Sequence, residues 1–331
     1  MAEPERWQEI LRDMMAAEAS DLHIAPGQCA QMRRDGVLTP TAFVPTAAFM
    51  ERLLVGMLTE KQRAALRRGD VDFAWSCDGR RFRGNVYRVQ EGLGLSLRLL
   101  PTRIRTPEEI GMPSSLRAIA EERDGLVLIC GATGAGKTTT LAALIEIVNR
   151  MRRVHIITLE DPIEYVFSPG CAFLSQREAG RDFFAFSDAV RSALREDPDI
   201  LLVGEIRDRA TMEAALMAAA TGVLVLGTLH TRNAPQTALR VESMFPADVR
   251  DAVRAQFADA VTGIFAQRLL PRKGGGRAAV FEALCATAAV RNILRQGNYS
   301  QLVSVMMSGA AQGMQTAEMA ETDLRAKGII A

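Results

Sequence analysis

The chain has 331 residues, 48% of them hydrophobic and 24% charged. This is an ordinary globular composition, and the length allows two domains. A net charge of +1 does not suggest a nucleic-acid or anionic-membrane partner bound through bulk electrostatics, and it leaves a local basic patch open. Five scattered cysteines without a C-x-x-C pair exclude the usual zinc frameworks and favour a reducing compartment.

We expect a cytoplasmic protein, on the N-terminal region and on the length of the most apolar stretch. It lacks the basic and apolar segments of a signal peptide. Apolar residues at helical spacing from Trp7 to Met15 predict an amphipathic helix, and the same spacing over residues 46–68 predicts a second one. The most apolar stretch, residues 216–229, is too short to cross a bilayer.

Strand signals follow these helices. Residues 71–75 and 82–89 alternate between apolar and polar, and an Asp-Gly dipeptide lies between them, which predicts a β-hairpin. Residues 95–100 predict a further strand. We therefore expect residues 1–100 to form a small α+β domain with an antiparallel sheet.

The pattern changes after a segment rich in Pro, Thr, Arg and Gly at residues 101–113, which we interpret as an interdomain linker. Strands are then expected at 126–130, 154–159, 200–203 and 223–227, and helices at 137–149, 187–195 and 208–219. Continuous apolar strands that alternate with helices predict an α/β domain, residues 114–331, with a parallel sheet covered on both faces.

The C-terminal region, from Ala247 onward, is predicted to be mostly helical. The expected apolar face consists of Val249, Val253, Phe257, Val261 and Ile264.

The most specific motif is the glycine-rich loop (residues 131–138), which matches G-x-x-x-x-G-K-T between a buried strand and an amphipathic helix. Such a loop directs backbone N–H groups toward phosphate oxygens at a helix N-terminus. Lys137 is expected to reach the β- and γ-phosphates of ATP, and the Thr138 hydroxyl to bind Mg²⁺. The expected ATP-binding residues are Gly131, Thr133, Gly134, Ala135, Gly136, Lys137, Thr138 and Thr139.

The second motif is acidic and follows the strand expected at residues 200–203. Gly204 stands where a Mg²⁺-binding Asp is common, and Glu205 comes next. A carboxylate at this edge of a sheet can polarise the attacking water, which makes Glu205 the candidate catalytic residue. The alternative is a solvated loop acid. Asp208 is expected to cap the next helix.

A third cluster ends the strand at 154–159. Glu160 and Asp161 could hold Mg²⁺ or its water ligands, because ligands of an open parallel sheet bind at this edge. Glu164 is either part of this site or a surface acid.

The chain contains three histidines. His230 closes a strand at the same edge, where it could sense the γ-phosphate, although a lone histidine is usually structural. His155 is expected at the opposite edge and His23 in the other domain, so both are predicted to be structural.

Arginines crowd the strands of the first domain, and a P-loop site often takes its transition-state charge from a neighbouring domain or subunit. The candidates are Arg80, Arg81, Arg83, Arg88 and Arg98. Composition alone favours solvated strand-face arginines.

Together these segments resemble the secretion ATPase superfamily, and within it the type IV pilus retraction ATPases (PilT-like). The matching motifs are Glu160–Glu164 (Asp box), Leu202–Asp208 (atypical Walker B) and Gly227–Thr231 (His box), together with Ala19–His23, Arg81–Asn85 and Gly313–Thr316. The resemblance covers nearly the whole chain.

The resemblance implies a PAS-like N-terminal domain, a RecA-like ATPase core with a helical C-terminal part, and a homohexameric ring. It implies Glu205 as the catalytic glutamate, Glu160 as the acid beside Mg²⁺ and water, and His230 as the γ-phosphate sensor. Arg83 and Arg98 then correspond to arginines presented to the nucleotide.

The resemblance also implies partners and a place in the cell. The expected partners are an inner-membrane pilus platform protein and a paralogous retraction ATPase, with no nucleic acid. We expect the protein at the cytoplasmic face of the inner membrane, at the pilus base.

Two features favour retraction over pilus assembly or type II secretion, the alternatives within the superfamily. Related assembly motors carry a tetracysteine insert soon after the segment that matches Gln267–Leu269, and this chain has none. Residues 289–294 resemble the AIRNLI motif associated with retraction. A P-loop kinase or a nucleotide-gated module is a further alternative, but no acceptor-substrate lid is visible and both Lys137 and Glu205 are present.

Overall fold

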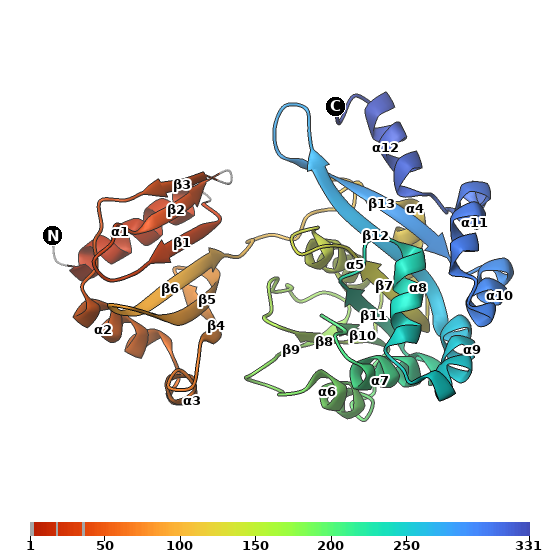
Figure 1. Cartoon of the computed structure of the whole chain (residues 1–331), viewed down its shortest axis with the longest axis horizontal. Coiled ribbons are helices and arrows are strands. Elements are labelled where there is room, and N and C mark those ends of the chain that lie inside the picture. Colours follow the sequence, from red (N-terminus) through yellow and green to blue (C-terminus); the bar gives the residue numbers. More distant parts are fainter. Residues whose placement is uncertain (1–2, 18, 35–36) are drawn as a thin grey trace. The chain divides into compact units, whose positions relative to one another are not determined.

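The chain forms two compact units, Met1–Arg103 and Ile104–Ala331, and each is considered by itself (Figure 1). The computed structural model describes residues 3–17, 19–34 and 37–331. The division between the units falls within residues 101–113. The linker role of this segment and the domain bounds at 100 and 114 stay predictions. No helix in the described ranges is long and apolar enough to cross a bilayer.

The first unit contains the expected antiparallel sheet, with six strands. Their spatial order is β3 (Val37–Pro40), β2 (Gln31–Arg34), β1 (Asp21–Ile24), β6 (Gly92–Leu99), β5 (Arg80–Val89) and β4 (Val71–Cys77). The predicted hairpin is confirmed: β4 pairs with β5, and Asp78 and Gly79 between them have φ values of 48° and 72°. Positive φ at both turn residues matches the twist of the strands.

One face of this sheet is apolar and packs on helices. Helices α1 (Glu3–Ala16) and α2 (Ala47–Met57) contribute buried residues to this core, and α3 (Glu60–Ala65) follows α2 without burying any of its residues. The single helix predicted over 46–68 is wrong, because the chain leaves the helix at Leu58 and restarts at Thr59. The Thr59 hydroxyl accepts from the Gln62 amide, and the Gln62 side chain accepts from the Thr59 amide. This capping box begins α3.

The second unit is built on a seven-stranded sheet. Its spatial order is β13 (Arg277–Cys285), β12 (Val261–Pro271), β7 (Gly125–Cys130), β11 (Leu224–Leu229), β10 (Ile200–Val203), β8 (His155–Glu160) and β9 (Phe173–Glu178). All neighbouring strands are parallel except the β12–β13 pair. The parallel sheet predicted from the buried apolar runs is confirmed.

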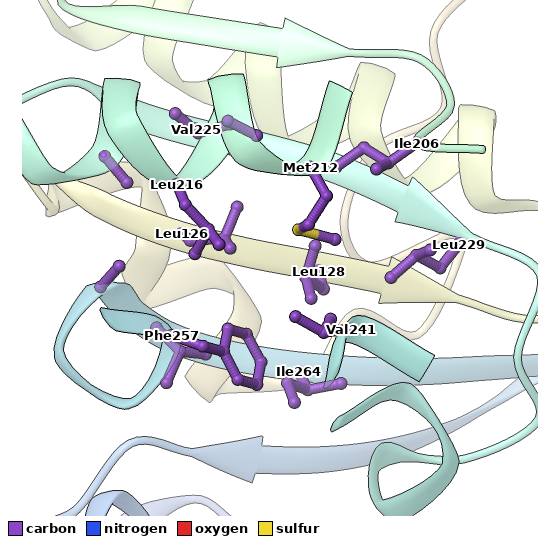
Figure 2. Packing of buried hydrophobic residues seen from close by; sticks show 14 of the residues in the cluster. Leu126, Leu128, Ile206, Met212, Leu216, Val225, Leu229, Val241, Phe257 and Ile264 are labelled. Atoms are coloured by element: carbon purple, nitrogen blue, oxygen red, sulfur yellow. The ribbon is translucent and has the colours of Figure 1, made fainter. Parts of the chain in front are cut away.

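Helices cover both faces of this sheet (Figure 1). They are α4 (Ser114–Ala118), α5 (Lys137–Met151), α6 (Phe186–Ala193), α7 (Arg209–Ala220), α8 (Ala234–Ser243), α9 (Arg250–Ala260), α10 (Ala288–Gln296), α11 (Leu302–Ser308) and α12 (Ala317–Ala326), with single 3₁₀ turns at Ile119–Glu121, Ala247–Val249, Tyr299–Gln301 and Ala310–Gln312. Figure 2 shows Leu126 and Leu128 of β7 among Met212 and Leu216 of α7 and Phe257 of α9, all buried. This packing fixes the strand that leads into the glycine-rich loop.

The prediction for the C-terminal region is wrong over residues 261–285. Val253 and Phe257 lie on α9 as expected, but Val261 and Ile264 lie on β12, which adds to the sheet beside β7. Helical spacing could not separate the two, because the helix runs directly into the strand. The β-branched Val261 and Thr262 favour the extended conformation. Three helices do follow, α10, α11 and α12.

Candidate active site

The carboxyl ends of the central parallel strands bring the predicted site residues to one edge of the sheet. The glycine-rich loop follows β7, and Glu160 is the last residue of β8. Glu205 lies two residues beyond β10, and His230 directly follows β11. This is the edge at which open α/β sheets bind ligands.

The glycine-rich loop folds closely against the sheet. Gly131, Gly134 and Gly136 have φ values of 152°, 77° and 89°, which side-chain-bearing residues rarely adopt. A Cβ on Gly131 would lie 2.3 Å from the carbonyl oxygen of Gln267, so only glycine fits there. The loop ends at the N-terminus of α5, where free backbone N–H groups and the helix dipole favour an anion.

Lys137, the first residue of α5, extends back over this loop. Its Nζ donates to the carbonyl oxygens of Gly131 at 2.7 Å and Ala132 at 3.1 Å. Burial lowers the pKa of Lys137 because it penalises the charged form, while the charge of Glu205 acts in the opposite direction. The ammonium group therefore lies at the glycine-rich loop, within the electrostatic influence of Glu205.

Glu205 and His230 come into direct contact. The Nε2 atom of His230 lies 3.2 Å from Oε1 of Glu205. Arg207 donates from Nη2 to the other oxygen, Oε2, at 2.6 Å. The hydrogen bond from Arg207 lowers the pKa of Glu205, and His230 and Lys137 add to the effect. Glu205 is thus held as a carboxylate among basic groups.

Close backbone contacts at Gly204 explain why this position, directly before Glu205, holds a glycine and no aspartate. Its amide donates to the carbonyl oxygen of Leu159 at 2.8 Å, so the chain here lies directly against the end of β8. A Cβ at this position would approach that oxygen to 2.9 Å. The Thr228 hydroxyl donates to the Gly204 carbonyl at 2.5 Å. These contacts fix the backbone that carries Glu205.

Glu160 lies at the same edge but is 7% exposed. Its Oε1 accepts from the Thr158 hydroxyl at 2.7 Å and from the side-chain Nε2 of Gln176 at 3.2 Å. Burial raises the pKa of Glu160 to about 7. These hydrogen bonds join the end of β8 to β9.

Three residues expected to be structural contact neighbouring polar groups. The Asp208 carboxylate accepts from the Thr211 amide at 2.8 Å and caps α7. His155 lies at the opposite edge, with its Nε2 3.1 Å from the Ser175 hydroxyl. His23 contacts Ser96 in the first unit at 3.0 Å.

Arg83 and Arg98 lie directly opposite each other on β5 and β6 of the first unit. Arg98 donates from Nε to Oδ1 of Asp21 at 2.8 Å. The two arginines thus share one face of the antiparallel sheet. Their contact with nucleotide stays a prediction.

Two residues of this edge were missed by the sequence predictions. Arg207 contacts Glu205, and its position two residues later in a short turn was the available signal. Gln267 of β12 is 5% exposed and accepts from the buried Thr140 hydroxyl at 2.7 Å. A polar residue within an apolar strand is the signal there, but helical spacing predicts a helix for this segment.

A parallel sheet that brings such a loop, a carboxylate and a histidine to one edge is typical of one class of proteins, the nucleotide-binding α/β ATPases. Residues 4–277 match the model of the family described as "Type II/IV secretion system protein". The match covers most of the chain, and the protein belongs to this family. It is accordingly an ATPase with an α/β fold that binds nucleotide.

Individual relatives extend the similarity to nearly the full length. The type IV pilus retraction ATPase PilT of Pseudomonas aeruginosa is 40% identical, over 97% of this chain and 94% of PilT. A twitching motility protein of Neisseria gonorrhoeae is 40% identical over 84% of this chain and 75% of its own. A crystal structure of the pilus retraction motor PilT with bound ADP has a TM-score of 0.90 at 38% identity, and covers 98% of this chain and 94% of that chain.

Proposed function

We propose that this protein is a homohexameric motor that hydrolyses ATP to power type IV pilus retraction. The observation that carries the proposal is the contact of Glu205 with His230 at 3.2 Å, at the edge that also holds the glycine-rich loop and Lys137. The similarity to PilT over nearly the whole chain supports the direction of the work.

The glycine-rich loop is the proposed P-loop that cradles the phosphates of ATP. Loop N–H groups and the α5 N-terminus bind the phosphate oxygens, and Lys137 moves from the loop carbonyls to the β- and γ-phosphates. The proposed ATP contacts are Gly131, Thr133, Gly134, Ala135, Gly136, Lys137, Thr138 and Thr139.

Mg²⁺ is the proposed companion ion of ATP. It needs only one or two protein oxygens when phosphates and water complete its shell. Within the described residues, no group of three or more His, Cys, Asp or Glu side chains is arranged to hold a metal ion. The half-buried Thr138 hydroxyl at the start of α5 fits the role of a single ligand, with Glu160 as the second candidate.

Glu205 is the proposed general base for the attacking water. Its lowered pKa keeps it ionised near neutral pH, as proton abstraction requires. His230 contacts this carboxylate and is the proposed sensor of the γ-phosphate. When ATP is bound, Mg²⁺ would neutralise charge on the phosphates, while Lys137 and the loop N–H groups bind and orient them.

The remaining parts of the proposal concern the whole assembly. The first unit is the proposed PAS-like domain and the second the proposed RecA-like core of each subunit. Arg83 and Arg98 are the candidate arginine fingers. The proposed partners are an inner-membrane pilus platform protein and a paralogous retraction ATPase, at the cytoplasmic face of the inner membrane.

The direct test is steady-state ATP hydrolysis by the purified protein. Lys137→Ala is expected to abolish turnover, and Glu205→Gln to lower it by roughly 10²- to 10⁴-fold, because it removes the general base but keeps the shape of the side chain. Glu213→Gln on the exposed face of α7 is the matched control and should behave as the wild type. Near-normal turnover in the Lys137 or Glu205 variant would refute the mechanism.

A further inference from the structure

Glu282 is a buried carboxylate that the proposed site does not use. It lies on β13 opposite Ala266, within the sheet of the second unit, and is 7% exposed. A charge at such a position is stable only when hydrogen-bond donors surround it. Its donors therefore indicate what the residue holds in place.

Two backbone amides that act on the Glu282 carboxylate are the first amides of helices. The Ala234 amide, which opens α8, donates to Oε1 at 2.6 Å. Burial raises the pKa of Glu282, and the Ala317 amide, which opens α12, acts in the opposite direction together with the Ala234 amide. The first amides of a helix have no partner within it, and the positive end of the helix dipole favours an anion. One side chain thus joins the N-termini of two helices that are distant in the sequence.

The start of α8 is connected to the candidate active site through the β11–α8 loop (residues 230–233). This short loop begins with His230 and ends at Asn233, the N-cap of α8. Its Thr231 hydroxyl lies 2.6 Å from the Thr237 hydroxyl, which also contacts the Cys130 sulfur, at 3.1 Å, just before the glycine-rich loop. A shift of the α8 N-terminus would therefore move His230 relative to Glu205.

We infer that Glu282 is a positioning residue, which holds the β11–α8 loop and hence His230 in register with Glu205, and couples this loop to α12. The inference rests on the proposed role of His230. It also gives a function to the Gly313–Thr316 motif. Gln315 of that motif pairs its backbone with Ala283, next to Glu282, and Thr316 caps α12.

Glu321 supplies a matched control. It lies on α12 and pairs with Arg268 of β12, so it also holds α12 to the β12–β13 hairpin. It lies outside the hydrogen-bond chain that leads to α8. Loss of Glu321 should loosen α12, whereas loss of Glu282 should loosen both α12 and the β11–α8 loop.

The experiment compares Glu282→Gln with Glu321→Gln in the full-length protein, by hydrogen–deuterium exchange and by ATPase kinetics. We expect faster exchange across residues 230–238 only in Glu282→Gln. We also expect its kcat to fall roughly 10- to 100-fold, because a small displacement of a catalytic contact has this effect. KM should change by less than about twofold. In a His230→Ala background the same substitution should lower kcat no further, since both changes remove one contact.

Unchanged exchange across residues 230–238, or an additive effect with His230→Ala, would overturn the inference. If Glu282→Gln does not fold, Glu282→Asp replaces it, because its shorter carboxylate keeps the charge but cannot span both amides. The proposed function fails separately: in that case Lys137→Ala or His230→Ala turns over normally, whatever the exchange of the β11–α8 loop.

Discussion

Glu205 has a basic partner on each of its carboxylate oxygens, and these two contacts can be tested by mutation. Arg207 occupies one oxygen and His230 the other. The sequence predicted Glu205 and His230 because each follows a buried strand at one sheet edge. It could not predict that Arg207 shares this carboxylate, because the turn that brings the two together depends on contacts with β8 and β11.

Arg207→Ala should shift the acidic limb of the pH profile of kcat/KM to higher pH. Arg207 is the main cause of the lowered pKa of Glu205, so its removal raises that pKa, and the base becomes protonated at a higher pH. Arg209→Ala is the control, because Arg209 pairs with Glu213 instead. An unchanged acidic limb would mean that Glu205 is not the group that titrates.

Glu160→Gln should raise the Tm of the nucleotide-free protein at pH 8 more than at pH 5. The pKa of Glu160 is about 7 in the folded protein against an ordinary value of 4.5, so the folded state binds the proton more tightly. Stability is therefore lost as pH rises from 4.5 to 7, by up to about 3 kcal/mol. Glutamine mimics the neutral acid and avoids this loss. Equal Tm changes at both pH values would contradict the buried environment of Glu160.

Among the helices and strands, those with a clear pattern in their own residues could be predicted. Those stabilised mainly by pairing with distant strands could not. Residues 200–203 could be predicted as a buried strand because four apolar residues in a row, bounded by turn residues, are typical of a parallel sheet. The four-residue strands β1, β2 and β3 have no such run of apolar residues, because pairing with neighbouring strands stabilises them instead. The mixed composition of β9 concealed an edge strand in the same way.

Strand β12 also supports the glycine-rich loop, which the prediction of a helix there could not reveal. Gln267→Leu should lower the free energy of unfolding by about 1–3 kcal/mol, because it leaves the fully buried Thr140 hydroxyl without its acceptor. The double variant Gln267→Leu/Thr140→Val removes both partners and should be more stable than the single one. Urea unfolding of both variants checks this. A double variant less stable than the single one would show that the hydrogen bond is not the cause.

In the whole molecule, the two units carry different groups that the proposed motor would use. The second unit carries the glycine-rich loop, Glu205 and His230. The first carries Arg83 and Arg98 side by side on its sheet. Sequence patterns predicted an antiparallel sheet in the first part of the chain and a parallel sheet in the second. The direction of the work depends on partners outside the chain, so it has to be measured in the cell.

Deletion of the gene in its host tests the proposed retraction function most directly, with surface pili and twitching motility as readouts. A retraction motor predicts more surface pili and no twitching, because assembly continues without withdrawal. The wild-type gene should restore both, and the Glu205→Gln variant should restore neither. Loss of surface pili on deletion would contradict retraction and identify an assembly motor instead.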